Sequence, residues 1–101
     1  MFDKARELYQ LQKKAKEVQK ELRNTEIEAK SVDGLVSVLF TADQKIKTLD
    51  IDESLLESGK KKELEEKLTR VVSEGLSRVQ AVAAEKTKGL MGEMGLNIPG
   101  M

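Results

Sequence analysis

Five basic residues recur through the first 23 positions at spacings that place them on one side of a helix. At 100° per residue they fall within about 100° of one another. They are Arg6, Lys13, Lys16, Lys20 and Arg23, here called the basic stripe. A ladder of cations can track the phosphates of a nucleic acid, because each neutralised phosphate releases counterions. A solvated helix face with ordinary ion pairs explains the same charges, and residue identities alone do not decide between the two.

A second basic cluster, Lys60-Lys61-Lys62, lies where another long helical pattern begins. Positive charge at the start of a helix opposes the helix dipole, but together with the free backbone N–H groups it suits a bound anion. Glu63, Glu65 and Glu66 follow directly, so a solvated lysine run is the simpler explanation. We include the three lysines among the candidate DNA-binding residues.

The residues that most enzymes need are missing from this sequence. It contains no Cys and no His, which excludes disulfides, the usual zinc sites, Cys or His nucleophiles and the commonest general base. Asp50, Asp52 and Glu53 form a dense carboxylate set, but without the spacing of a calcium loop, and a strand end followed by a helix cap explains them better. We expect no enzyme activity, no metal, no cofactor and no small-molecule substrate.

Length and composition indicate one thin domain. The chain has 101 residues, of which only one Tyr and two Phe are aromatic, so the core lacks large side chains and oligomerisation is the economical way to bury amphipathic surface. Eighteen basic residues balance eighteen acidic ones, so net charge gives no support to a nucleic-acid partner. The absence of a long apolar run predicts a cytoplasmic protein with no membrane partner.

The stripe must be positioned by a helix, for which residues 2–23 carry the right pattern. Leu8, Leu11, Ala15, Val18 and Leu22 recur at spacings of three and four, which indicates a narrow apolar seam roughly opposite the stripe. A period-two pattern then predicts three short antiparallel strands over 26–30, 35–41 and 45–51. Asp33-Gly34 suits a tight hairpin turn, and residues 42–44 suit a second turn.

A second helix is predicted from near Ser58 or Gly59 to near Lys88 and Gly89, with a wide apolar stripe. The fold class is α+β, in the order helix, three-stranded antiparallel β-meander, long helix. Residues 1–88 form a single domain, and the Gly- and Met-rich residues 89–101 form a flexible tail. The expected core and dimer residues are Leu8, Leu11, Val18, Leu22, Val36, Val38, Phe40, Leu68, Val72, Leu76 and Val79.

This layout resembles the YbaB/EbfC family of bacterial nucleoid-associated proteins over nearly the whole chain. The likeness is carried by residues 11–15 (LQKKA), 34–38 (GLVSV) and 49–56 (LDIDESLL), and by Pro99-Gly100 near the end. Glu53 stands where the family usually has Pro, and Ala42-Asp43 where it often has Gly. The resemblance implies an intertwined homodimer that binds double-stranded DNA with little or modest sequence preference, in the bacterial nucleoid, with a role in nucleoid organisation and gene regulation.

A rival function is that of a protein-interaction or chaperone-like dimer that does not bind DNA. In that case the apolar seam and the Met-rich tail would grip a polypeptide. Prefoldin-type subunits share the order helix, β-hairpin, helix, but their helices are long coiled-coil arms. A helix of 22 residues extends only about 33 Å, which favours the DNA-binding alternative.

Overall fold

The computed structural model describes residues 2–93. Helix α1 (Phe2–Arg23) comes first and has the predicted bounds. Carbonyl groups of its last turn accept hydrogen bonds from the residues that follow the helix. The backbone N–H of Asn24 donates to the Lys20 carbonyl at 3.1 Å, and the Thr25 hydroxyl donates to the Glu21 carbonyl at 2.7 Å. The Leu22 carbonyl also accepts from the N–H of Thr25 at 3.2 Å, so most carbonyls of the last turn are satisfied immediately before the first strand.

The three strands form the predicted antiparallel meander, β1 (Glu26–Lys30), β2 (Val36–Thr41) and β3 (Lys45–Ile51), in the order β1-β2-β3. The turn predicted at Asp33-Gly34 is longer than expected. The N–H of Ser31 donates to the Val36 carbonyl at 2.8 Å, and only Gly34, at φ 75°, has a left-handed backbone. A tight type I′ turn needs positive φ at two successive residues, so that part of the prediction was wrong.

A β-bulge interrupts the pairing of β2 with β3. Phe40 pairs with Ile46 and Leu39 pairs with Thr48, which leaves Lys47 as the extra residue. Because directly paired residues share a face of the sheet, Ile46 lies on the side of Phe40. The pairing of Val38 with Leu49 likewise places Leu49 on that side.

Helix α2 (Lys61–Glu93) follows a short 3₁₀ helix, η1 (Glu53–Leu56). The Asp52 carboxylate caps η1 by accepting from the N–H of Ser54 at 2.9 Å. The predicted start of α2 was too early, because Gly59 has a left-handed backbone with φ 87°. The predicted end was also wrong, since α2 continues through Gly89 to Glu93. The rest of the predicted tail, 94–101, lies outside the described residues.

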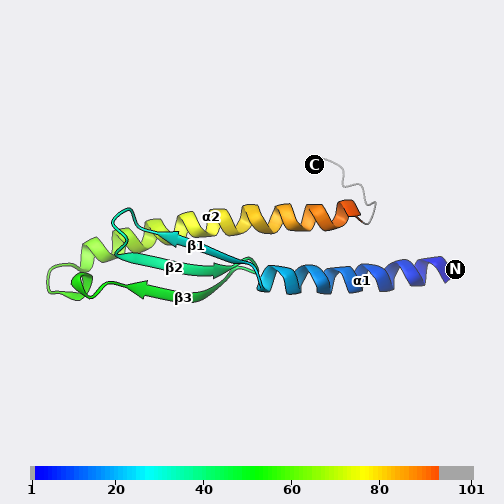
Figure 1. Cartoon of the computed structure of the whole chain (residues 1–101), viewed down its shortest axis with the longest axis horizontal. Coiled ribbons are helices and arrows are strands. Elements are labelled where there is room, and N and C mark those ends of the chain that lie inside the picture. The colour runs from blue at the N-terminus through cyan, green and yellow to red at the C-terminus, as the bar shows by residue number, and fades with distance from the viewer. Residues whose placement is uncertain (1, 94–101) are drawn as a thin grey trace.

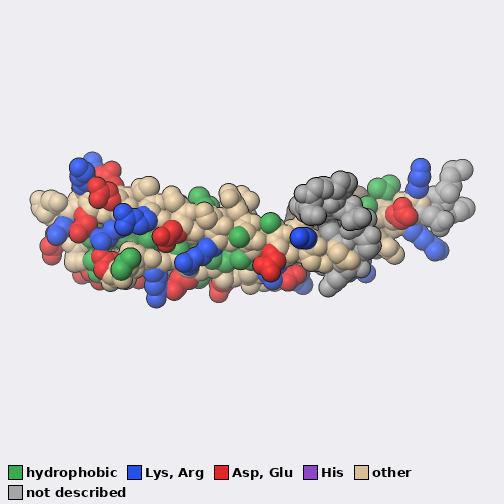
Figure 2. Space-filling view, turned by 90° about the horizontal axis from the view of Figure 1, so that it is seen from above, with side chains coloured by type: hydrophobic (Ala, Val, Ile, Leu, Met, Phe, Trp, Pro, Cys, Tyr) green, Lys and Arg blue, Asp and Glu red, His purple; other side chains and the backbone are tan. Residues whose placement is uncertain are grey.

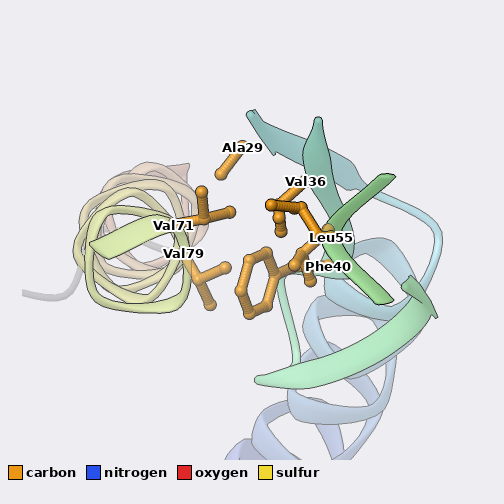
Figure 3. Packing of buried hydrophobic residues seen from close by; sticks show 7 residues of the cluster. Ala29, Val36, Phe40, Leu55, Val71 and Val79 are labelled. Atoms are coloured by element: carbon orange, nitrogen blue, oxygen red, sulfur yellow. The ribbon is translucent and has the colours of Figure 1, made fainter. Parts of the chain in front are cut away.

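The core lies between α2 and one face of the sheet (Figure 3). Val36, Val38 and Phe40 of β2 are buried there, under Val71 and Val79 of α2. The cluster is completed by Ala29 of β1 and Leu55 of η1, while Leu68 and Val72 are partly buried against it. Helix α2 contacts β1 and β2, so the inner face of β3 is less well covered.

The protein is a rod of 68 × 24 × 15 Å. Helix α1 extends away from the sheet beside the C-terminal part of α2 (Figure 1), and Lys86 Nζ on α2 lies 3.0 Å from Glu21 Oε1 on α1. The rod thus has a sheet end and a helical end. Neither described helix is apolar over a stretch long enough to cross a bilayer.

Candidate nucleic-acid interface

Helix α1 is attached to the rest of the protein by only part of its apolar seam. Val18 and Leu22, in its C-terminal half, are partly buried. Leu8 and Leu11, in its N-terminal half, are 63% and 39% exposed. The first turns of α1 therefore project into solvent, while the last turns are held against the domain.

Every residue of the basic stripe is exposed. Among the residues whose side chains are described, no carboxylate forms a salt bridge with any of the five. The salt bridges found in this part of the chain use seven lysines from outside the stripe: Lys14, Lys30, Lys45, Lys47, Lys60, Lys67 and Lys86. A helix face with ordinary ion pairs is therefore a poor description of the stripe. Its charges are available to an external anion.

The distribution of charge separates α1 from the remainder of the chain. Residues 2–23 carry seven Lys and Arg against four Asp and Glu, a net charge of +3. Because the whole chain has a net charge of zero, the remaining residues carry −3. A locally basic surface exists in spite of the neutral total.

The Lys60-Lys61-Lys62 cluster lies near the start of α2, beyond the sheet and far from α1 (Figure 1). Lys60 Nζ is 3.8 Å from Glu63 Oε2. Basic and acidic side chains are intermingled over this end of the rod (Figure 2). One protomer therefore does not bring the lysine cluster and the basic stripe onto a common surface.

The most strongly perturbed carboxylate has a structural role. Asp33, in the β1–β2 loop, accepts hydrogen bonds from Lys67 of α2, from the Ser31 hydroxyl at 2.7 Å and from the Leu35 N–H at 3.1 Å. The hydrogen bond from Lys67, followed by the other two, holds the pKa of Asp33 well below its usual range, and the same bond raises the pKa of Lys67. These contacts fasten the loop to α2. No cluster of ligands that could hold a metal ion occurs among the described residues.

Two residues that sequence reasoning missed lie beside the last turn of α1. Gln44 and Lys45, at the β2–β3 turn, line a hollow of about 420 Å³ together with Arg23 and Gln19. In the structure Gln44 is distinguished by its left-handed backbone, with φ 69° although the residue is not glycine. Neither residue is close to the stripe in sequence, so only the fold brings them together.

Residues 1–94 match the model of the YbaB/EbfC DNA-binding family. The chain belongs to this family. A nucleoid-associated protein of Synechocystis is 40% identical over 102 residues, covering 99% of this chain and 82% of that protein. A nucleoid-associated protein of Rhodopseudomonas palustris is 38% identical over 90 residues, covering 89% of this chain and 84% of that protein.

The fold is similar to the crystal structure of an uncharacterized protein from Helicobacter pylori. The TM-score is 0.70 at 29% sequence identity, and the match covers 86% of this chain and 87% of the other. The same arrangement of sheet and helices therefore occurs in that protein. The family resemblance expected from the sequence is confirmed.

Proposed function

We propose that this YbaB/EbfC-family protein binds double-stranded DNA through the basic stripe of α1, as a homodimer with little sequence preference. The observation that carries the proposal is the stripe itself, whose five cations are exposed and have no carboxylate partner among the described side chains. Binding of this kind places the protein in the bacterial nucleoid, where it contributes to DNA organisation and gene regulation. The names of its relatives support this assignment.

The mode of binding follows from the chemistry of the stripe. Lysine and arginine side chains on one helix face contact phosphates, which position a protein on DNA but carry no sequence information. If each protomer contacts three phosphates, a dimer neutralises about six, and the slope of log K against log salt is about −5. The stripe is expected to contribute more than the Lys60-Lys61-Lys62 cluster, because acidic neighbours offset the charge of that cluster.

The test compares two triple variants that remove the same charge. Lys13, Lys16 and Lys20 are changed to Gln in one variant, and Lys60, Lys61 and Lys62 in the other. Affinity for a labelled random duplex is measured by fluorescence anisotropy across a salt series. We expect the first variant to lose most binding and salt dependence, and the second to resemble the wild type. A wild-type slope near zero, or no binding at low salt, contradicts the proposal and favours a protein-interaction function.

The homodimer is supported by apolar side chains that a single protomer leaves in solvent. Ile46 and Leu49 lie on the core face of the sheet yet are 55% and 48% exposed, and Leu76 of α2 is 40% exposed. Leu8 and Leu11 extend the apolar surface along α1. A second copy that covers this surface buries them without a new protein partner, and a two-fold axis presents the stripe twice.

The oligomeric state tests this part of the proposal through two substitutions on one strand. Leu49→Asp places a charge on the exposed inner face of β3, whereas Thr48→Asp places the same charge on the opposite face. Burying an unpaired carboxylate costs several kcal/mol, so Leu49→Asp is expected to sediment as a monomer and Thr48→Asp as a dimer. Dimers of equal stability in both variants would show that β3 is outside the interface.

A further inference from the structure

The turn between β2 and β3 is held against the C-terminal end of α1. The N–H of Ala42 donates to the Leu22 carbonyl at 3.0 Å and to the Thr25 carbonyl at 2.9 Å. These bonds fix the turn beside Arg23, the last residue of the basic stripe, as the path of the chain in Figure 1 shows. They also occupy carbonyls at the negative end of the α1 dipole, which would otherwise repel an anion.

Cationic and amide side chains make up half of the lining of the hollow at this junction, and Leu22, Ala42 and Ala83 supply its apolar part. Arg23 and Lys45 supply positive charge, and Gln19 and Gln44 supply side-chain N–H donors. Asp43 is the acidic residue in the lining, and its carboxylate already accepts a hydrogen bond from the Thr41 hydroxyl. Lys45 Nζ lies 3.9 Å from Asp43 Oδ2, and its side chain is 76% exposed. This loose pair leaves the ammonium group available to a phosphate.

The backbone of Gln44 provides an independent argument. Residues 42–44 form a three-residue hairpin loop between the paired residues Thr41 and Lys45, and Gln44 occupies its left-handed position with φ 69°. Glycine is usual at this position, because a Cβ makes the left-handed conformation unfavourable. A glutamine here costs stability, which directs attention to a functional use of its side chain.

We propose that Gln44 and Lys45 extend the DNA-contacting surface from the stripe onto the β2–β3 turn, where they contact the phosphate backbone near the C-terminal end of α1. The Gln44 amide donates a hydrogen bond to a phosphate oxygen, and Lys45 acts with Arg23 to neutralise the charge. This inference rests on the proposed DNA-binding function. It adds a contact from a loop to the contacts from a helix.

Two substitutions in the full-length protein separate these roles in the same salt-series assay with a random duplex. Gln44→Gly removes the amide and the strain together, so it should melt at or above the wild-type temperature and yet bind about tenfold more weakly. Its salt slope should not change, because no charge is removed. Lys45→Gln should make the slope less negative by about two, since a dimer loses two phosphate contacts.

The control is Lys30→Gln, at the end of β1 away from α1, which removes one charge from the same sheet. Its slope and affinity should match those of the wild type. If Gln44→Gly and Lys45→Gln bind DNA with the same affinity and salt slope as the wild type and Lys30→Gln, the turn is not a contact, although the DNA-binding function stands. If the wild type itself does not bind, the function fails first.

Discussion

Gly75 lies in α2 where the helix packs tightly against Phe40 of the sheet, and replacing it with alanine tests the packing of the core. A Cβ placed on Gly75 would lie 2.0 Å from Phe40 Cε2 and 2.6 Å from Cζ. The Phe40 ring is 1% exposed and is enclosed by buried valines of β2 and α2 (Figure 3). Either the ring or the helix must therefore move to admit one methyl group.

Two opposing contributions set the size of the effect. Alanine improves helix propensity by about 1 kcal/mol over glycine, whereas overpacking a core costs about 1–3 kcal/mol or more. Because 2.0 Å is far inside van der Waals contact, we place the overpacking at the upper end. The net loss in the free energy of unfolding is then about 2 kcal/mol, which lowers Tm by roughly 10 °C for a domain of this size.

The assay is urea unfolding followed by circular dichroism, at one fixed protomer concentration for all variants. Gly89→Ala is the matched control, because Gly89 also lies in α2 and a Cβ there meets no atom within 4 Å. It should be neutral or slightly stabilising. In a double-mutant cycle, Phe40→Leu should cost less in the Gly75→Ala background than alone, with a coupling above about 0.5 kcal/mol. A Gly75→Ala variant as stable as Gly89→Ala would refute the reasoning.

Two other changes probe the contacts that fix the loops. Asp33 has a lowered pKa in the folded protein, so its stabilising contribution is present above the ordinary aspartate pKa of 3.8 and is lost as the pH falls below it. Asp33→Asn should therefore lower the urea midpoint at pH 7. On acidification its midpoint should fall less than that of the wild type or of Asp50→Asn, and parallel curves of midpoint against pH would contradict this. Leu55→Ala should cost about 2–5 kcal/mol because Leu55 is 2% exposed, whereas Leu56→Ala, at 66% exposure, should change stability by about 0.5 kcal/mol or less. Equal effects of the two leucine substitutions would show that η1 does not anchor the core.

Most of the fold could be predicted because its signals are local. The seam of α1 repeats every three or four residues, and the strands alternate with period two, so the order of elements followed from the sequence. The end of α2 did not, because a glycine after an apolar helical pattern predicts a stop, whereas in the structure Gly89 is an ordinary helical residue. Gly75 carries a further local signal, since a glycine within an apolar helical stripe indicates close approach of another element.

The candidate site could be predicted only in part, for a similar reason. Helical periodicity is enough to place five cations on one face, but whether carboxylates neutralise them depends on side chains elsewhere in the fold. The proximity of Lys45 to Arg23 depends on backbone hydrogen bonds from Ala42 to residues about 20 positions earlier. A sequence pattern does not encode that distance.

The neutral net charge is compatible with DNA binding when charge is considered along the rod. Near physiological salt the screening length is about 8 Å, whereas the molecule is 68 Å long. DNA on α1 therefore responds mainly to the +3 of that helix and little to charges at the sheet end of the rod. At about 0.01 M salt the screening length grows to about 30 Å, and the net charge of −3 on the residues outside α1 then opposes binding of the same duplex. We expect log K to rise less steeply below about 0.03 M salt than a line fitted at higher salt predicts. A straight line over the whole range would show that the charge outside α1 does not oppose binding.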